Sequence, residues 1–330
     1  MKKIVIIPTF CESHLIECQI PNIIDTINPD YIIYNEGMFP NGTEGNKQLT
    51  KEWLDKYTLN GEGKRGFDFL ELETIINKAQ QKYPNTKIIL NQIDYFPGMS
   101  STDCYIKAAT NFEQLGIKVE EGDYIFPYEG DVFHHEDDIE NIKYYLEQIK
   151  PGEGFRSMWI DYMQNFWYAD KRTIKTYLLD QRYHHENNYM SRRICFRYDK
   201  GGIKYLNMLK NFMTTNYHDP IEGYGILYPT DLITYHYAWI RPGKFRDLRC
   251  DQLQRHPGYW ENFVKGLDMC DEYKFNEIRV RPGLKGYSNE FVKFFSEHTH
   301  PKHIKKHPLW TNLDKDVINS LRNLDDIKHN

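Results

Sequence analysis

The sequence of 330 residues predicts an α/β protein with a mostly parallel central sheet flanked by helices. Through the first 150 residues, short apolar β-branched runs alternate with longer segments whose apolar residues recur at helical spacing. The runs are continuously apolar, as expected of strands that are buried on both faces. Each run ends in polar or turn-forming residues. Because the carboxyl ends of parallel strands meet at one edge of the sheet, these polar residues are predicted to converge there.

The expected elements follow in order along the chain. Strands are predicted at Ile4–Ile7, Tyr31–Tyr34, Lys87–Leu90 and Asp123–Tyr128. Helices are predicted from after Phe10 through Ile20, over Phe67–Tyr83, over Ser101–Leu115 with a Ser or Thr cap, and from Glu136 onwards, with a weaker helical pattern at Leu49–Tyr57.

The pattern changes after Pro151-Gly152. Further strands are expected at Gly154–Tyr162, Arg192–Tyr198 and Leu232–Ile240, and a further helix at Ile203–Met213. The remainder is charged and helical in places. The second half is therefore predicted to be mixed, with a helical C-terminal extension.

Composition gives no support to several kinds of partner or location. The net charge of -5 gives no reason to expect a nucleic acid or an anionic membrane as partner. No apolar run approaches the roughly 20 residues of a membrane span, and the apolar run after Met1 is too short for a signal peptide. The 6 cysteines form no CxxC pair, which indicates free thiols in a reducing compartment. We therefore expect a cytoplasmic protein, or one of the host cytoplasm if its source is a virus.

The segment Glu129-Gly130-Asp131 carries the most informative chemistry. Two carboxylates separated by a glycine follow directly on the fourth predicted strand. Hard oxygen ligands of this kind suit Mg²⁺ or Mn²⁺ that also binds phosphate groups. The alternative is a solvated acidic loop, and Glu136, Asp137 and Asp138 further on are typical of a helix start, where the dipole favours negative charge. Neither a GxGxxG motif nor a Walker A motif follows the first strand, which disfavours a dinucleotide site and a P-loop.

Four pieces of the sequence together resemble the GT-A fold of nucleotide-sugar glycosyltransferases, most closely the family 2-like enzymes. They are IVIIPTF (4–10), DYIIYNEG (30–37), GDYIFPYEGD (122–131) and TYHYAWIRP (234–242). The resemblance covers roughly residues 1 to 260. It departs from the family pattern at Glu129, where the DxD motif begins with aspartate, and at Asn35-Glu36, where paired aspartates are usual.

The resemblance implies a GT-A (Rossmann-like) domain whose nucleotide-sugar-binding half is residues 1–150 and whose acceptor-side half is residues 151–260, followed by a C-terminal extension over 261–330. It implies sugar transfer from a nucleotide-diphosphate sugar, with a UDP-sugar favoured, to an acceptor hydroxyl. The acceptor stays open between a glycan, a lipid-linked sugar, a protein and a modified nucleic acid. Two other functions stay open: a nucleotidyltransferase, and a non-catalytic carbohydrate-binding protein with a degenerate transferase fold.

The resemblance also implies roles for individual residues. Mn²⁺ or Mg²⁺ would be held by Asp131, Glu129 and His236. The nucleotide-sugar would be bound by Pro8, Thr9, Glu36, Asp94, Glu129, Arg241 and Arg249, with Lys244 and Arg246 as further candidates for a lid over the diphosphate. The base that deprotonates the acceptor in an inverting reaction would be Asp219 or Glu222, with Asp161 and Asp231 as rivals. A retaining reaction would need no such base.

Near the C-terminus, His298, His300, His303 and His307 invite comparison with a zinc site. Their spacing is irregular and no cysteine joins them. The pattern favours a polar surface segment over a metal site.

Overall fold

The structure is a computed structural model. It describes residues 1–37, 50–93, 112–162, 166, 168–170, 191–200, 226–237, 240–241, 244–245, 248, 291–293 and 300–311.

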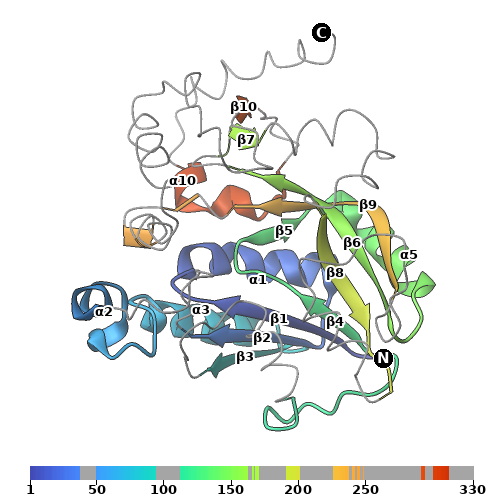
Figure 1. Ribbon diagram of the computed structural model, residues 1–330, viewed down its shortest axis with the longest axis horizontal. Coiled ribbons are helices and arrows are strands. Elements are labelled where there is room, and N and C mark those ends of the chain that lie inside the picture. Colours follow the sequence, from blue (N-terminus) through green and yellow to red (C-terminus); the bar gives the residue numbers. More distant parts are fainter. Residues whose placement is uncertain are drawn as a thin grey trace.

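An eight-stranded mixed sheet forms the centre of the described protein, in the order β3-β2-β1-β4-β8-β6-β9-β5 (Figure 1). Its strands are β1 (Lys3–Thr9), β2 (Tyr31–Glu36), β3 (Lys87–Gln92), β4 (Tyr124–Pro127), β5 (Val132–His134), β6 (Glu153–Asp161), β8 (Ser191–Arg197) and β9 (Ile226–His236). The first four, β1 to β4, run parallel to one another, so their carboxyl ends share one edge. β8 is antiparallel to β4 and to β6, which begins the mixed half. These pairings confirm the predicted α/β fold.

Three helices cover one face of this sheet: α1 (Ser13–Ile27), α3 (Phe69–Lys82) and α5 (Ile139–Gln148). They pack their apolar sides on alternate residues of the parallel strands, among them Val5, Ile7 and Phe126. The opposite face, including Ile4, Ile6 and Ile125, packs on Phe112 and Ile117. β1 is therefore buried on both faces, as its continuous apolar run predicts.

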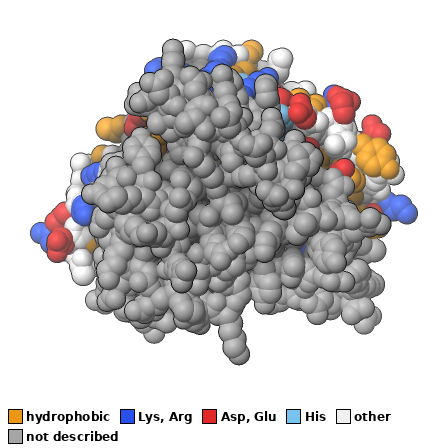
Figure 2. Space-filling model, turned by 90° about the horizontal axis from the view of Figure 1, so that it is seen from above, with side chains coloured by type: hydrophobic (Ala, Val, Ile, Leu, Met, Phe, Trp, Pro, Cys, Tyr) orange, Lys and Arg blue, Asp and Glu red, His pale blue; other side chains and the backbone are white. Residues whose placement is uncertain are grey.

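Shorter elements complete the described chain. They are α2 (Lys51–Tyr57), η1 (Leu59–Gly61), η2 (Glu136–Asp138), η6 (Ile304–Lys306), α10 (Pro308–Thr311) and a two-stranded antiparallel sheet of β7 (Tyr168–Asp170) and β10 (Phe291–Lys293). Described side chains of both charge signs appear around the rim of the face in Figure 2. Within the described ranges, every helix is too short or too polar to be a transmembrane span.

α1 extends beyond its predicted end at Ile20. Pro21 lies inside the helix, which ends at Asn28 in the left-handed conformation with φ 50°. A proline inside a helix costs about 3 kcal/mol. Ile23 and Ile27 are buried in the core beyond it, and each contributes about 1.5–3 kcal/mol by burial. Packing on the sheet thus outweighs the proline.

Two other predicted helices have different outcomes. Most of the helix expected over Ser101–Leu115 lies outside the described residues, but residues 112–116 form a turn, so the predicted end is wrong. Phe112 and Ile117 are fixed there by packing on the sheet. The helix expected over Ile203–Met213 also lies outside the described residues.

His300, His303 and His307 are buried, so the prediction of a polar surface segment is wrong for these three residues, while His298 lies outside the described residues. His300 and His307 are fully buried, and Ile304 joins the core cluster beside α1 and β9. His300 lies between the Tyr237 hydroxyl, 2.8 Å from its Nδ1, and the Phe166 carbonyl, 2.9 Å from its Nε2. Burial lowers the pKa of His300 to about 3. A neutral imidazole can be buried in a core when both of its nitrogens have hydrogen-bond partners. Those partners come from distant parts of the chain, so the local sequence does not reveal them.

Candidate metal centre

The loop after β4 delivers two carboxylates to the end of β9. Glu129 and Asp131 lie between β4 and β5, and β5 pairs antiparallel with β9 so that Val132 stands opposite His236. The backbone N–H of Tyr237 donates to the Asp131 carbonyl at 2.9 Å, which extends this pairing by one step. β5 has only 3 residues. Its pairing brings the acidic motif and the distant histidine together.

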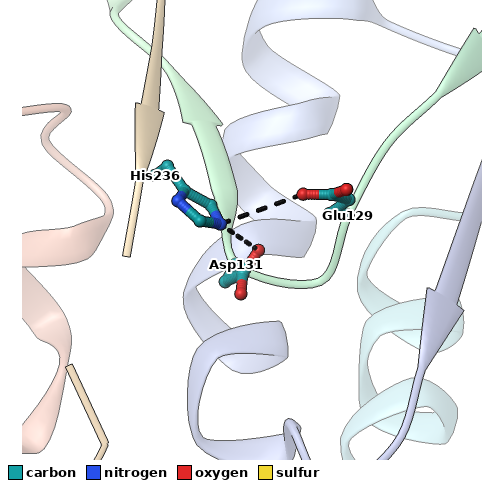
Figure 3. A group of neighbouring side chains, drawn as sticks. All are labelled: Glu129, Asp131 and His236. Atoms are coloured by element: carbon teal, nitrogen blue, oxygen red, sulfur yellow. Dashed lines mark ion pairs between the residues drawn. The ribbon is translucent and has the colours of Figure 1, made fainter. Parts of the chain in front are cut away.

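Glu129, Asp131 and His236 point toward one another (Figure 3). His236 Nε2 is 3.3 Å from Asp131 Oδ1 and 3.8 Å from Glu129 Oε2. One ligand atom from each side chain lies within 4.8 Å of the other two. Two ligands at right angles on a Mg²⁺ ion lie about 3 Å apart, given bonds of about 2.1 Å. The separations therefore need only a small adjustment to hold such an ion.

The three side chains of this group differ in their exposure to solvent. The side chains of Asp131 and His236 are buried, whereas Glu129 keeps 22% of its side-chain surface exposed. Carboxylate oxygens and a neutral imidazole are ligands that Mn²⁺ and related ions accept. The group can thus hold a divalent ion, and Glu129 is the most exposed of its three side chains.

Arg241 and Glu12 extend the group. The Arg241 Nη2 donates to Asp131 Oδ2 at 3.2 Å and to Glu12 Oε1 at 2.8 Å. Burial alone would lower the pKa of the Arg241 guanidinium, but Glu12 and Asp131 outweigh it and raise that pKa. With their carboxylates ionised, Glu12, Glu129 and Asp131 leave two negative charges after Arg241 is counted. One divalent cation neutralises that charge.

Gln19 fixes the acidic loop from α1. This fully buried side chain donates through Nε2 to the Glu129 carbonyl at 2.6 Å and to the Val132 carbonyl at 3.0 Å. The Tyr34 hydroxyl in turn donates to Gln19 Oε1 at 3.3 Å. Neither Gln19 nor Glu12 was anticipated from the sequence. Glu12 could have been found from its position, because an acidic residue that follows closely on the first predicted strand is expected at the carboxyl edge of the sheet.

Three of the residues expected to bind a nucleotide, Pro8, Thr9 and Glu36, lie at the adjoining carboxyl ends of β1 and β2. Pro8 and Thr9 of β1 stand opposite Asn35 and Glu36 of β2. The Gly66 N–H donates to Glu36 Oε1 at 2.7 Å, and burial raises the pKa of Glu36 to about 8. The Thr9 hydroxyl and Glu36 Oε2 are buried without a hydrogen-bond partner among the described residues. Two buried polar groups at this edge thus lack a hydrogen-bond partner among the described residues.

Of the remaining predicted residues that the structure describes, Lys244 and Asp231 contact other side chains. The Lys244 ammonium lies 4.3 Å from the centroid of the Phe67 ring. Asp231 accepts a hydrogen bond from the Tyr145 hydroxyl at 2.7 Å. Asp161 stands beside His236 in the register of β6 and β9. Asp94, Asp219, Glu222, Arg246 and Arg249 lie outside the described residues.

Comparison with known proteins gives no family. No protein-family model matches the sequence, and no curated protein matches it. One similar solved structure is S. aureus TarS 1-349, with 10% identity, a TM-score of 0.33 and coverage of 77% of this chain and 65% of that chain. Another is mannose-6-phosphate isomerase from Helicobacter pylori, with 9% identity, a TM-score of 0.32 and coverage of 77% and 88%.

A third similar structure is mannose-1-phosphate geranyltransferase from Thermus thermophilus, with 9% identity, a TM-score of 0.26 and coverage of 81% and 65%. This chain spans 65% of the shorter TarS structure and 44% of the longer one. At these TM-scores the function has to be inferred from the site itself.

Proposed function

We propose that the chain is a metal-dependent glycosyltransferase that uses a nucleotide-diphosphate sugar, with a UDP-sugar favoured, as its donor. The observation that carries the proposal is the convergence of Glu129, Asp131 and His236 beside the carboxyl ends of the parallel strands. Open α/β sheets bind their ligands outside this edge. The order and spacing of the four GT-A-like sequence pieces support the same function. Residues 1–150 would bind the donor and residues 151–260 the acceptor, with residues 261–330 as an extension.

The metal would assist sugar transfer by stabilising the leaving group. Mn²⁺ or Mg²⁺, held by Asp131, Glu129 and His236, would stabilise the negative charge that develops on the departing nucleotide diphosphate. Arg241 lies next to Asp131 and would add a guanidinium to the same anion. Thr9 and Glu36 would bind the base or ribose with the polar atoms that lack a described partner. Asp94 and Arg249 remain proposals for the same ligand, and Asp219 and Glu222 for the acceptor base.

The metal centre is tested by calorimetry of UDP binding with and without Mn²⁺. We expect binding that depends on the metal, and loss of that dependence in Asp131→Ala and His236→Ala. Asp137→Asn is the matched control, because this nearby acid is 86% exposed in its side chain and lies outside the group. The proposal would be refuted if UDP bound equally well with and without Mn²⁺. It would also be refuted if Asp131→Ala kept the Mn²⁺-dependent binding of UDP.

A nucleotidyltransferase is the second candidate, since the same carboxylates would hold the metal for chemistry at a phosphate. The products separate the two functions. A glycosyltransferase incubated with UDP- and GDP-sugars releases a nucleoside diphosphate by slow donor hydrolysis, even without its acceptor. A nucleotidyltransferase joins a nucleoside triphosphate to a sugar phosphate and releases pyrophosphate. Mass spectrometry of both reactions distinguishes them.

A further inference from the structure

Glu12 enters the metal centre from the turn between β1 and α1. Cys11, just before it, has φ 56°, in the left-handed region that non-glycine residues rarely adopt. This turn directs the Cys11 carbonyl toward Arg241, whose Nη1 lies 3.5 Å away, and places the Glu12 carboxylate on the same guanidinium. Only 13% of the Glu12 side-chain surface is exposed. A largely buried carboxylate in an uncommon turn indicates a specific role.

Because Gly130 has no side chain, the Glu12 carboxylate can lie directly against it. A Cβ atom added at Gly130 would overlap Glu12 Oε2. This overlap would force the Glu12 side chain to move. The glycine between the two carboxylates of the acidic motif therefore admits a third carboxylate, which comes from a different part of the chain.

Glu12 acts on Asp131 through Arg241. It is not one of the three side chains whose ligand atoms lie within 4.8 Å of one another. It instead accepts a hydrogen bond from Arg241 Nη2, which also donates to Asp131 Oδ2. The other oxygen of Asp131, Oδ1, faces His236. The two oxygens of Asp131 are thereby assigned to different partners, one to Arg241 and one to the metal position.

We propose that Glu12 is a positioning residue of the metal centre. It holds Arg241 against Asp131 Oδ2, so that Asp131 Oδ1 is presented to the cation. It also adds a third negative charge to the group. This inference rests on the proposed metal site. Partners of metal ligands typically change metal affinity by about 10–100-fold when they are mutated. Loss of one negative charge acts in the same direction, because the cation is attracted less strongly.

Titration of the full chain with Mn²⁺ alone, followed by electron paramagnetic resonance, tests this role without any nucleotide. We expect Glu12→Gln to bind Mn²⁺ about 10–100-fold more weakly and to change the spectrum of the bound ion. Gly130→Ala should act in the same direction, because its methyl group displaces the carboxylate that Glu12→Gln neutralises. Since both changes act through one contact, the double variant should lose less affinity than the two single losses combined. Glu17→Gln, an exposed acid on α1, is the matched control and should bind like the wild type.

Thermal melts of each variant separate this role from a structural one. If Glu12 only stabilised the fold, Glu12→Gln would lower Tm and leave the Mn²⁺ affinity and spectrum unchanged. Wild-type affinity in both Glu12→Gln and Gly130→Ala, with binding still lost in Asp131→Ala, would overturn the role of Glu12 and leave the metal site intact. Fully additive losses in the double variant would also overturn it. Failure of the wild type to bind Mn²⁺ would remove both the metal site and this inference.

Discussion

Glu36 should make the protein less stable as the pH rises from 5 to 8. Its side chain is fully buried, and burial raises its pKa from 4.5 to about 8. The Gly66 N–H that donates to Oε1 favours the ionised form and opposes this shift only in part. Between these two pH values the unfolded chain has lost the Glu36 proton while the folded protein keeps it. The unfolded state then binds fewer protons, so the free energy of unfolding falls with increasing pH.

The size of this effect follows from the two pKa values. Each pKa unit corresponds to about 1.4 kcal/mol, so the full shift is worth about 5 kcal/mol. Integrated between pH 5 and pH 7, the contribution is about 2–3 kcal/mol. Glu36→Gln removes the titrating proton and keeps an oxygen that can accept from Gly66. The free energy of unfolding of the variant should therefore fall by about 2–3 kcal/mol less than that of the wild type between pH 5 and pH 7.

Urea unfolding at pH 5, 6 and 7, followed by tryptophan fluorescence, measures this difference. The comparison uses the change with pH in each protein, because the new amide can itself add a constant cost of about 1–3 kcal/mol if its N–H groups lack partners. Glu17→Gln, at an exposed position on α1, should follow the wild type. Parallel pH profiles for the wild type and Glu36→Gln would refute the reasoning. The result also bears on the site, because a protonated Glu36 offers a ligand an O–H donor at neutral pH.

Two further predictions concern the supports of the site. Gln19→Leu should lower the free energy of unfolding by about 1–3 kcal/mol for the buried Val132 carbonyl that loses its donor, and by a smaller amount for the part-buried Glu129 carbonyl. The same change should weaken Mn²⁺ binding. Urea unfolding and Mn²⁺ titration check both effects, and unchanged stability would contradict the prediction. Ile304→Ala should cost about 2–5 kcal/mol in urea unfolding because Ile304 is fully buried in the core cluster beside α1, whereas a loss below about 0.5 kcal/mol, as at ordinary surface positions, would mean that residues 300–311 do not belong to the core.

The parallel half of the sheet could be predicted from sequence because its strands carry their own signal. Ile4, Val5, Ile6 and Ile7 are fully buried, and a short run that is apolar on both faces is typical of a strand covered on both sides. The acidic motif was recognisable for a related reason, since it follows directly on such a strand. Local pattern and position along the chain were enough to place Glu129 and Asp131 at the sheet edge.

The contacts across the site depend on pairing that no local pattern reveals. β5 is three residues long, and Val132-Phe133-His134 has too few positions to show a strand periodicity. Its pairing with β9 nevertheless fixes which residue faces the acidic motif. The sequence suggested His236 through the resemblance alone. The buried histidines are a similar case, because His300 is acceptable in the core only where Tyr237 and Phe166 supply its hydrogen bonds.

α1 connects these separate pieces more directly than any strand does. Just before its first turn, Glu12 binds Arg241, and within it Gln19 holds the acidic loop by two carbonyls. Near its other end, Asp25 accepts a hydrogen bond of 2.8 Å from His303 when Nε2 of that histidine carries the proton. The helix is itself fixed on the sheet by a row of buried isoleucines. A change in how α1 packs would therefore move Glu12 and the loop of the acidic motif together. For this reason Gly130, Glu12 and Gln19 are all expected to affect the binding of one metal ion, although none of them is proposed to bind it.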